Sequence, residues 1–198
     1  MNLREFGLLL ESDPRLPCVT RIIVGRRLRS SWWGHPKAEL IYAVSNRLSN
    51  HRDVLTVKLV AGKVTFVHRR LWAAVIAVAT SSEEWQFEGL APATRRLFTL
   101  VSRKGILETN QLPGYERQSR AVAGAARELE RRLLVYGQDF HTSSGAHAKR
   151  LETWERWARR TGFTGSTIET EGGKKMLEEI LAHMSRGADV KKLLPWHD

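Results

Sequence analysis

The chain contains little cysteine, because Cys18 is the only thiol among its 198 residues. A lone cysteine excludes an internal disulfide framework, and nothing near Cys18 in the sequence would activate it as a nucleophile. No run of about 18 apolar residues is present that could span a membrane. The first residues also lack a basic segment followed by an apolar run and a small-residue cleavage site. We therefore expect a soluble protein of the reducing cytoplasm, with no membrane partner.

Acidic residues are also scarce: 21 Asp and Glu stand against 32 Lys and Arg, for a formal net charge of +11. Residues 1–89 hold 13 basic against 8 acidic side chains, and residues 90–165 hold 14 against 7. The last 33 residues hold 5 against 6. This excess predicts a polyanionic partner, since neutralising phosphates releases counterions. RNA and anionic lipids would be attracted in the same way, so charge alone does not select duplex DNA.

The region from Ala91 to Trp157 has the element order of a winged helix-turn-helix. Pro92 suits the first turn of a helix, and Gly105 suits the position just after its end. A turn of small residues later separates two segments that can pair as a hairpin, or wing. The pattern predicts, in order, a helix from Pro92 to Gly105, a short strand or helix at 106–112, a long helix at 119–134, strands at 133–140 and 146–151, and a helix with Trp154 and Trp157.

The long helix carries more arginines than its glutamates can balance. Apolar and small residues occupy one predicted face, including Ala123 to Ala126, which would let the helix pack closely. The other face could lie along a major groove of DNA. Its predicted DNA contacts are Arg117, Arg120, Arg127 and Arg131. The alternative is a solvated face with i,i+4 ion pairs, such as Glu128 with Arg132.

The predicted wing is polar and basic near its tip. Hydroxyl groups and cationic side chains on such loops commonly contact phosphates or the minor groove. The predicted contacts are His141, Ser143, Ser144, His147, Lys149 and Arg150. Two histidines without a nearby cysteine or acid at ligand spacing are weak evidence for zinc, so we expect neither a metal nor a cofactor.

The front of the chain repeats this layout. Corresponding glycines and tryptophans recur at nearly the same spacing: Gly62 and Gly145 are 83 residues apart, and Trp72 and Trp154 are 82 apart. Chance spacing of common elements is the alternative explanation. The front pattern predicts a helix from Asn2 through Leu10, a short helix from Pro17 to Gly25, a helix from His35 that buries Leu40, Ile41, Val44 and Leu48, strands at 54–60 and 63–68, and a helix with Leu71 and Trp72.

These patterns predict a mainly α protein with short β-hairpins, an α+β fold of tandem winged helix-turn-helix units. The first unit would cover residues 1–88 and the second residues 89–165. Residues 166–198 would form a helical tail. In that tail, the apolar stripe from Met176 to Met184 would either pack back on the body or make a homodimer contact, and the sequence leaves both open.

A dense cluster of cationic and aromatic residues lies between Arg26 and Lys37. Such a cluster could grip a phosphate backbone or stack an unpaired base. Its predicted contacts are Arg29, Trp33, His35 and Lys37, and Lys63 in the first hairpin is added to them. The alternative is that one tryptophan fills the core while the other shields a loop, with His35 bonding a backbone carbonyl.

Three segments carry a resemblance to a known family. They read AARELERRLLVYGQDFHTSSGAHAKRLETWERWARRTG, which ends at Gly162, SWWGHP, and KLVAGKVTFVHRRLW. Together they resemble an uncharacterised bacterial family related to the winged-helix crosslink-repair DNA glycosylases of the AlkZ/YcaQ type. The resemblance covers about residues 16–162 and implies a DNA-binding scaffold of tandem winged helices, linked to the removal of alkylated bases.

The catalytic Gln-x-Gln motif of those glycosylases is absent. The glutamines here are Gln86, Gln111, Gln118 and Gln138, and no two are separated by one residue. No catalytic residue can therefore be carried over.

Apart from the resemblance, one compact group of carboxylates and amides that could act in base excision lies around Trp85. Its members are Glu83, Glu84, Gln86 and Glu88, for which a solvated linker is the alternative interpretation. The sequence thus predicts a DNA-binding protein without catalysis, linked to DNA repair or regulation. A glycosylase with a divergent site and an RNA- or protein-binding scaffold are the alternatives.

Overall fold

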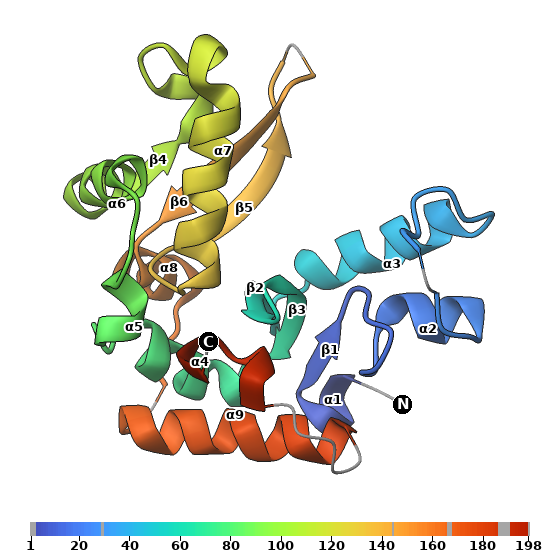
Figure 1. Cartoon of the computed structure of the whole chain (residues 1–198). Helices are drawn as coiled ribbons and strands as arrows, with labels where there is room; N and C mark the ends of the chain where they lie inside the picture. The colour runs from blue at the N-terminus through green and yellow to red at the C-terminus, as the bar shows by residue number, and fades with distance from the viewer. Residues whose placement is uncertain (1–2, 29, 144, 166–167, 186–190, 198) are drawn as a thin grey trace. The chain divides into compact units, whose positions relative to one another are not determined.

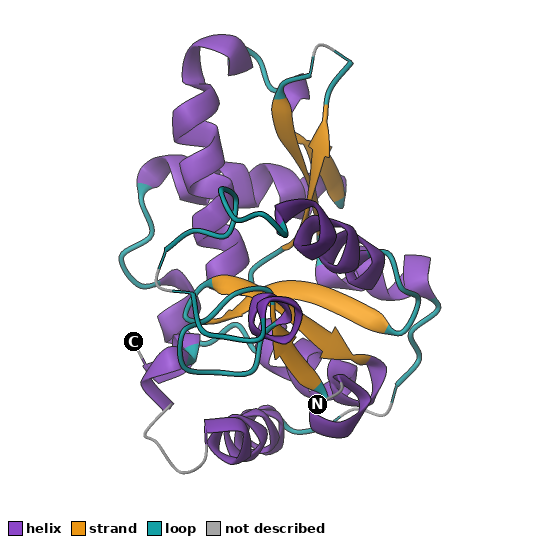
Figure 2. Ribbon diagram, turned by 90° about the vertical axis from the view of Figure 1, so that its right-hand side faces the viewer, coloured by secondary structure: helices purple, strands orange, loops and turns teal. Residues whose placement is uncertain are grey.

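The computed structural model describes residues 3–28, 30–143, 145–165, 168–185 and 191–197 (Figure 1). Side chains of residues 115–117 lie outside this description. Helices and two three-stranded antiparallel sheets form the fold, which confirms the α+β class (Figure 2). None of the described helices is both long and apolar enough to cross a membrane.

The chain divides into two units, but not at the predicted positions. The first unit combines residues 1–77 with residues 167–198, and the second contains residues 78–166. The boundary therefore falls after Ala77 instead of after residue 88. The C-terminal segment belongs to the first unit and does not form a separate tail.

The first unit contains a sheet of order β1-β3-β2 together with its covering helices. Its elements are α1 (Leu3–Phe6), β1 (Leu8–Leu10), α2 (Val19–Val24), α3 (Ala38–Ser49), β2 (Val54–Val60), β3 (Lys63–His68), a 3-10 turn (Arg69–Leu71), α4 (Trp72–Ala79), whose last residues extend past the boundary, α9 (Thr170–Ser185), and 3-10 turns at Lys191–Leu193 and Pro195–His197.

The hairpin of β2 and β3 has the predicted strand limits. Its two turn residues, Ala61 and Gly62, have φ of 51° and 63°, as in a tight two-residue hairpin turn. The prediction that one helix runs through Leu10 is wrong. Gly7, with φ of 83°, follows α1, and Leu8 to Leu10 then pair with β3 as an edge strand. Pairing with a distant segment overrides the helical spacing there.

Helix α9 packs against the first unit with its apolar stripe. Leu177 and Leu181 are fully buried, and Met184 is 5% exposed. Gly173 lies so close to α4 that an added Cβ would be 2.9 Å from the carbonyl oxygen of Ala74. The intramolecular alternative for the stripe is therefore what the structure has. A homodimer through this helix stays a prediction, and Met176, which is 40% exposed, marks the face left for it.

The second unit repeats the arrangement with a sheet of order β4-β6-β5. Its elements are α5 (Glu84–Phe87), α6 (Pro92–Lys104), β4 (Ile106–Glu108), a 3-10 turn (Thr109–Gln111), α7 (Tyr115–Arg131), β5 (Tyr136–His141), β6 (His147–Glu152) and α8 (Trp154–Thr161).

The core of the second unit forms where α6 and α7 meet the sheet. Val101 of α6, Ala126 and Leu129 of α7, and Leu151 of β6 are all fully buried in one cluster. Helix α6 begins at Pro92 and is followed by a glycine with φ of 74°, as predicted. This packing fixes α7 and the β5–β6 hairpin relative to each other.

Candidate nucleic-acid interface

Three exposed arginines form a line along α7, which we call the arginine stripe: Arg120, Arg127 and Arg131. At about 100° per residue they lie within about 40° of one another around the helix and span about 16 Å along it. No ion pair involves them among the described residues. The Nε of Arg127 donates to the carbonyl oxygen of Ala123, 3.2 Å away in the same helix.

The arginine stripe lies on the side of α7 that faces away from the core. Ala125, Ala126 and Leu129 make up the packed side, and each is 6% exposed or less. Gly124 lies close to the stripe, and a Cβ added there would meet nothing within 4 Å. The prediction that Gly124 helps the helix pack closely is therefore wrong. The stripe is an open, cationic helix surface with a glycine gap in it.

The β5–β6 hairpin projects beside α7. Its tip and the amino-terminal end of α7 lie at the same end of the second unit (Figures 1 and 2). Strand pairing continues to His141 and His147, two exposed residues whose ring centroids are 4.4 Å apart. The tip is closed by the amide of Thr142, which donates to Ala146 O at 2.9 Å, and Ser143 there is exposed. A polar ribbon thus accompanies the cationic helix.

Some predicted contacts hold carboxylates of their own unit. The Nη2 of Arg150 is 2.7 Å from Glu108 Oε1, and its side chain is 46% exposed. The predicted i,i+4 pair of Arg132 with Glu128 is present at 3.6 Å. Arg132 also donates to the carbonyl oxygens of Trp85 and Glu88. The i,i+4 ion pairing of the solvated-face alternative is therefore present at Arg132. The three arginines of the stripe are exposed and make no such pair among the described residues.

Lys149 is not a surface contact, which corrects the prediction. It is 8% exposed, and its Nζ lies 2.9 Å from Glu130 Oε2 and 2.7 Å from Asp139 Oδ1. Burial alone would lower the pKa of Lys149, but the two carboxylates outweigh burial and raise it. Sequence reasoning missed both counter-ions because Glu130 comes from α7 and Asp139 from the paired strand.

Three predicted residues lie wholly or partly outside the described part of the chain. Arg29 and Ser144 are not among the described residues. Arg117 belongs to the first turns of α7, and its side chain lies outside the description.

The predicted cluster in the first unit divides between core and surface. Trp32 is 5% exposed and Trp33 is 67% exposed, with their rings stacked 4.1 Å apart. Trp32 hydrogen-bonds Glu11, whose pKa is raised by burial despite that bond. One tryptophan thus fills the core, as the alternative interpretation has it. Trp33 presents an exposed ring, whose centroid is 6.3 Å from that of Tyr42.

The polar members of that cluster are tied to the backbone. His35 Nδ1 accepts a hydrogen bond from the backbone amide of Lys37 at 3.1 Å. The alternative expected the ring to bond a backbone carbonyl instead. Lys37 Nζ donates to Ile23 O at 2.8 Å, at the end of α2. Lys63 Nζ lies 2.6 Å from Asp13 Oδ2 and is 41% exposed. Lys63 therefore neutralises a buried carboxylate, which leaves it a weaker candidate for phosphate.

Two members of the carboxylate and amide group around Trp85, Glu83 and Gln86, form a helix cap, and Glu84 and Glu88 are exposed. Gln86 is fully buried, and its Oε1 accepts from the amide of Glu83 at 3.0 Å. Its Nε2 donates to the carbonyl oxygens of Ala79 and Arg132. Both ends of this amide are occupied, so it cannot position water for base excision. The solvated-linker interpretation is also wrong for Gln86, because its side chain is buried.

Among the described residues, no group of three or more His, Cys, Asp or Glu side chains is placed to hold a metal ion. Cys18 is buried, with its Sγ 3.1 Å from Thr20 Oγ1. Comparison of the chain with known family models, with curated proteins and with solved structures gave no match.

Proposed function

We propose that this protein binds duplex DNA through its second unit, acting as a winged helix. In this proposal α7 is the recognition helix in the major groove, and the β5–β6 hairpin is the wing that contacts adjacent phosphates. The first unit is a second winged helix in the same chain.

The order of elements supports this proposal. In each unit a helix and a strand precede a short helix or turn, a longer helix, a two-stranded hairpin and a closing helix. The first strand of each sheet pairs with the third strand, and the hairpin partner lies on the other side. Winged helices have this topology, and it leaves one side of the third helix free for a ligand.

The arginine stripe is the observation that carries the proposal. Arginine favours phosphate because its planar guanidinium can donate two parallel hydrogen bonds. Exposed cations in a line can bind a linear polyanion directly. A cation that is already paired with a carboxylate must first break that ion pair, which offsets part of the binding free energy. Gly124 adds to this, since a glycine lets another backbone approach the helix closely.

Catalysis is not part of the proposal. Base excision needs a group beside the base pocket that can position water or stabilise positive charge. In the group on which the glycosylase alternative depended, Glu83 and Gln86 are committed to capping α5. The proposed function is therefore DNA binding without base release.

The test replaces the arginine stripe. The triple variant R120A/R127A/R131A is compared with the parent by fluorescence anisotropy on a short labelled duplex, between about 50 and about 200 mM salt. Each lost phosphate contact flattens the log–log salt slope by about 0.9, so three contacts predict a change of about 2.7. Affinity at the lower salt concentration should fall by about tenfold or more, since this charge supplies most non-specific binding.

A matched control removes the same charge elsewhere in the second unit. R96A/R103A/R159A replaces three exposed arginines outside α7. Equal losses in both triple variants would show that net charge and not the arginine stripe drives binding, and would overturn the proposal. A complementary variant, G124R, adds a guanidinium beside the stripe and should steepen the salt slope by about 0.9.

A further inference from the structure

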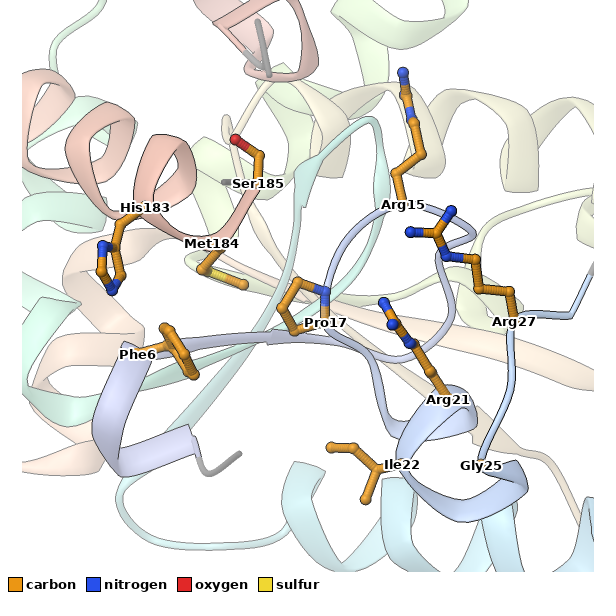
Figure 3. A pocket seen from close by; sticks show the side chains of 10 residues that line it. All are labelled: Phe6, Arg15, Pro17, Arg21, Ile22, Gly25, Arg27, His183, Met184 and Ser185. Carbon is orange, nitrogen blue, oxygen red and sulfur yellow. The ribbon is translucent and has the colours of Figure 1, made fainter. Parts of the chain in front are cut away.

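A pocket of about 520 Å³ opens within the first unit, apart from the arginine stripe. Figure 3 shows its lining side chains from α1, α2, the loops on either side of α2, and α9. Its size falls in the range of about 300–1,000 Å³ that small-molecule sites have. The lining residues are Phe6, Arg15, Pro17, Arg21, Ile22, Gly25, Arg27, His183, Met184 and Ser185.

One side of the pocket is cationic. Arg15, Arg21 and Arg27 line that side, and all three are exposed residues. The side chains of Arg21 and Arg27 extend toward each other, whereas that of Arg15 extends away from them (Figure 3). No carboxylate lines the pocket among the described residues, and none of the three arginines is ion-paired there. Unpaired like charges on one side of a pocket repel each other, so an anion placed there would be bound favourably.

The carboxylate of Asp13 is not free to neutralise this side. Asp13 accepts from the amides of Arg15 and Leu16 at 2.7 and 2.9 Å, and its other oxygen is held by Lys63. Its carboxylate is thus used in fixing the loop that carries Arg15. Lys37 is bonded to the end of α2. The carboxylate beside Arg15 is therefore already paired with Lys63 and does not neutralise the arginines.

The other side of the pocket is apolar. Phe6 and His183 face each other with ring centroids 5.9 Å apart, and Pro17 and Met184 lie between them and the arginines (Figure 3). Ile22 is 48% exposed in the same lining. Solvent contact of such side chains is unfavourable, and a hydrocarbon body would cover them.

We infer that this pocket binds a small amphipathic anion, a carboxylate or phosphate carried on a short apolar body. The acid group binds to Arg21 and Arg27, Arg15 adds to the positive potential of that side, and the apolar body lies along Pro17 and Met184 toward Phe6. A DNA phosphate lacks the apolar part and would leave that wall uncovered. The inference does not depend on the proposed function, since no residue of the arginine stripe takes part.

The test titrates the full chain with octanoate and octyl phosphate by isothermal calorimetry. Both should bind, octanol should bind at least about tenfold more weakly, and inorganic phosphate should displace neither at equal concentration. Losing a charge-assisted hydrogen bond weakens binding by about tenfold or more, so R15A/R21A and R27A should show that loss. R26A, an exposed arginine outside the lining, should bind both anions as the parent does.

The apolar wall has its own test. Met184→Gln keeps the side-chain length and should weaken octanoate while leaving the circular-dichroism spectrum unchanged. M184L serves as the variant that preserves the fold and should still bind. Octanol binding as tightly as octanoate, or R15A/R21A binding as the parent does, would overturn the inference. So would a preference for anionic phospholipid vesicles with no binding of the free anions, since that means a membrane surface and not a small-molecule site.

Discussion

In the first unit, α3 precedes the β2–β3 hairpin, and in the second unit α7 precedes the β5–β6 hairpin. Both helices bury one face against their own sheet and leave the other open. Leu40 and Tyr42 of α3 are 53% and 52% exposed, which corrects the prediction that Leu40 is buried. At about 100° per residue they flank an outward face that carries Glu39, Asn46 and Arg47. The open face of α7 carries the arginine stripe instead. The same topology therefore presents a mixed, mostly polar surface in one unit and a cationic surface in the other.

This difference shows that topology and surface chemistry vary separately in this chain. Core positions decide how each helix packs, because only those side chains touch the sheet. Exposed positions are free to take any charge at little cost to stability. A common fold in the two units is thus no reason to assign them the same partner, and the proposal of DNA binding through α7 does not extend to α3.

The largest expected effect separates the buried Lys149 of the second unit from the partly exposed Lys63 of the first, each paired with a buried carboxylate. Replacing Lys149 with Met leaves the buried carboxylate of Glu130 without that lysine, which costs about 3–5 kcal/mol of unfolding free energy. Lys63→Met should cost less, about 1–3 kcal/mol, because Asp13 still accepts from two backbone amides. Urea denaturation of both variants measures the difference.

The same Lys149 variant checks the corrected role of this residue. If Lys149 is structural, K149M keeps the salt slope of DNA binding wherever the variant remains folded. The double variant K149M/E130Q should recover much of the lost stability, because it removes the uncompensated charge. A flattened slope with unchanged stability would instead return Lys149 to the interface.

A smaller effect is expected to be the same in both units. Trp72 and Trp154 each open the helix after a hairpin, and their indole nitrogens donate to Val67 O at 3.1 Å and Leu133 O at 2.6 Å. Replacing either with Phe leaves a buried carbonyl without that donor, at a cost of about 1–3 kcal/mol. Denaturant unfolding of W72F and W154F should give similar losses, and W33F, at an exposed ring, should change stability by less than about 0.5 kcal/mol.

The smallest expected effect is a pH dependence of opposite sign in the two units. Burial would raise the pKa of Asp13, but Lys63 and two backbone amides outweigh it and hold that pKa below the ordinary 3.8. Its contribution is present above pH 3.8 and is lost as pH falls through the folded pKa. Lys149 has its pKa raised above 10.5, so its contribution is present below pH 10.5 and is lost as pH rises through the folded value.

Two variants assign these pH effects. D13N should remove part of the acid dependence of the unfolding free energy and leave the alkaline limb unchanged, and K149M should do the reverse. The acid effect should be the weaker one, because Lys63 is 41% exposed and its charge is screened by water. Equal pH curves for D13N and the parent would contradict the role given to Asp13.

Local signals in the sequence were sufficient for much of the fold. The limits of the first hairpin, the start of α6 at Pro92 and the glycines after α2 and α6 all follow from turn and capping chemistry. The helix prediction failed at Leu8 to Leu10 because Leu9 and Leu10 keep a helical spacing with Phe6, and only pairing with β3 makes the segment a strand. Such pairing is a property of the fold and not of the segment.

The candidate interface was predictable only in part, for a similar reason. Spacing places Arg120, Arg127 and Arg131 on one side of a helix, and the helix has them there. Nothing local to Lys149 reveals the two carboxylates that surround it. The pocket lined by Arg15, Arg21 and Arg27 was not predicted. Folding alone brings residues near position 184, in α9, next to residues near position 20.

The placement of α9 has a consequence for how the protein is made. The ribosome adds about 5–20 residues per second, from the amino terminus onward. Residues 78–166 are therefore complete, and able to fold, while the first unit still lacks Leu177 and Leu181. For several seconds the nascent chain exposes the apolar surface that α9 will cover. A chain terminated before α9 would keep that surface permanently open and become a substrate for chaperones and proteases.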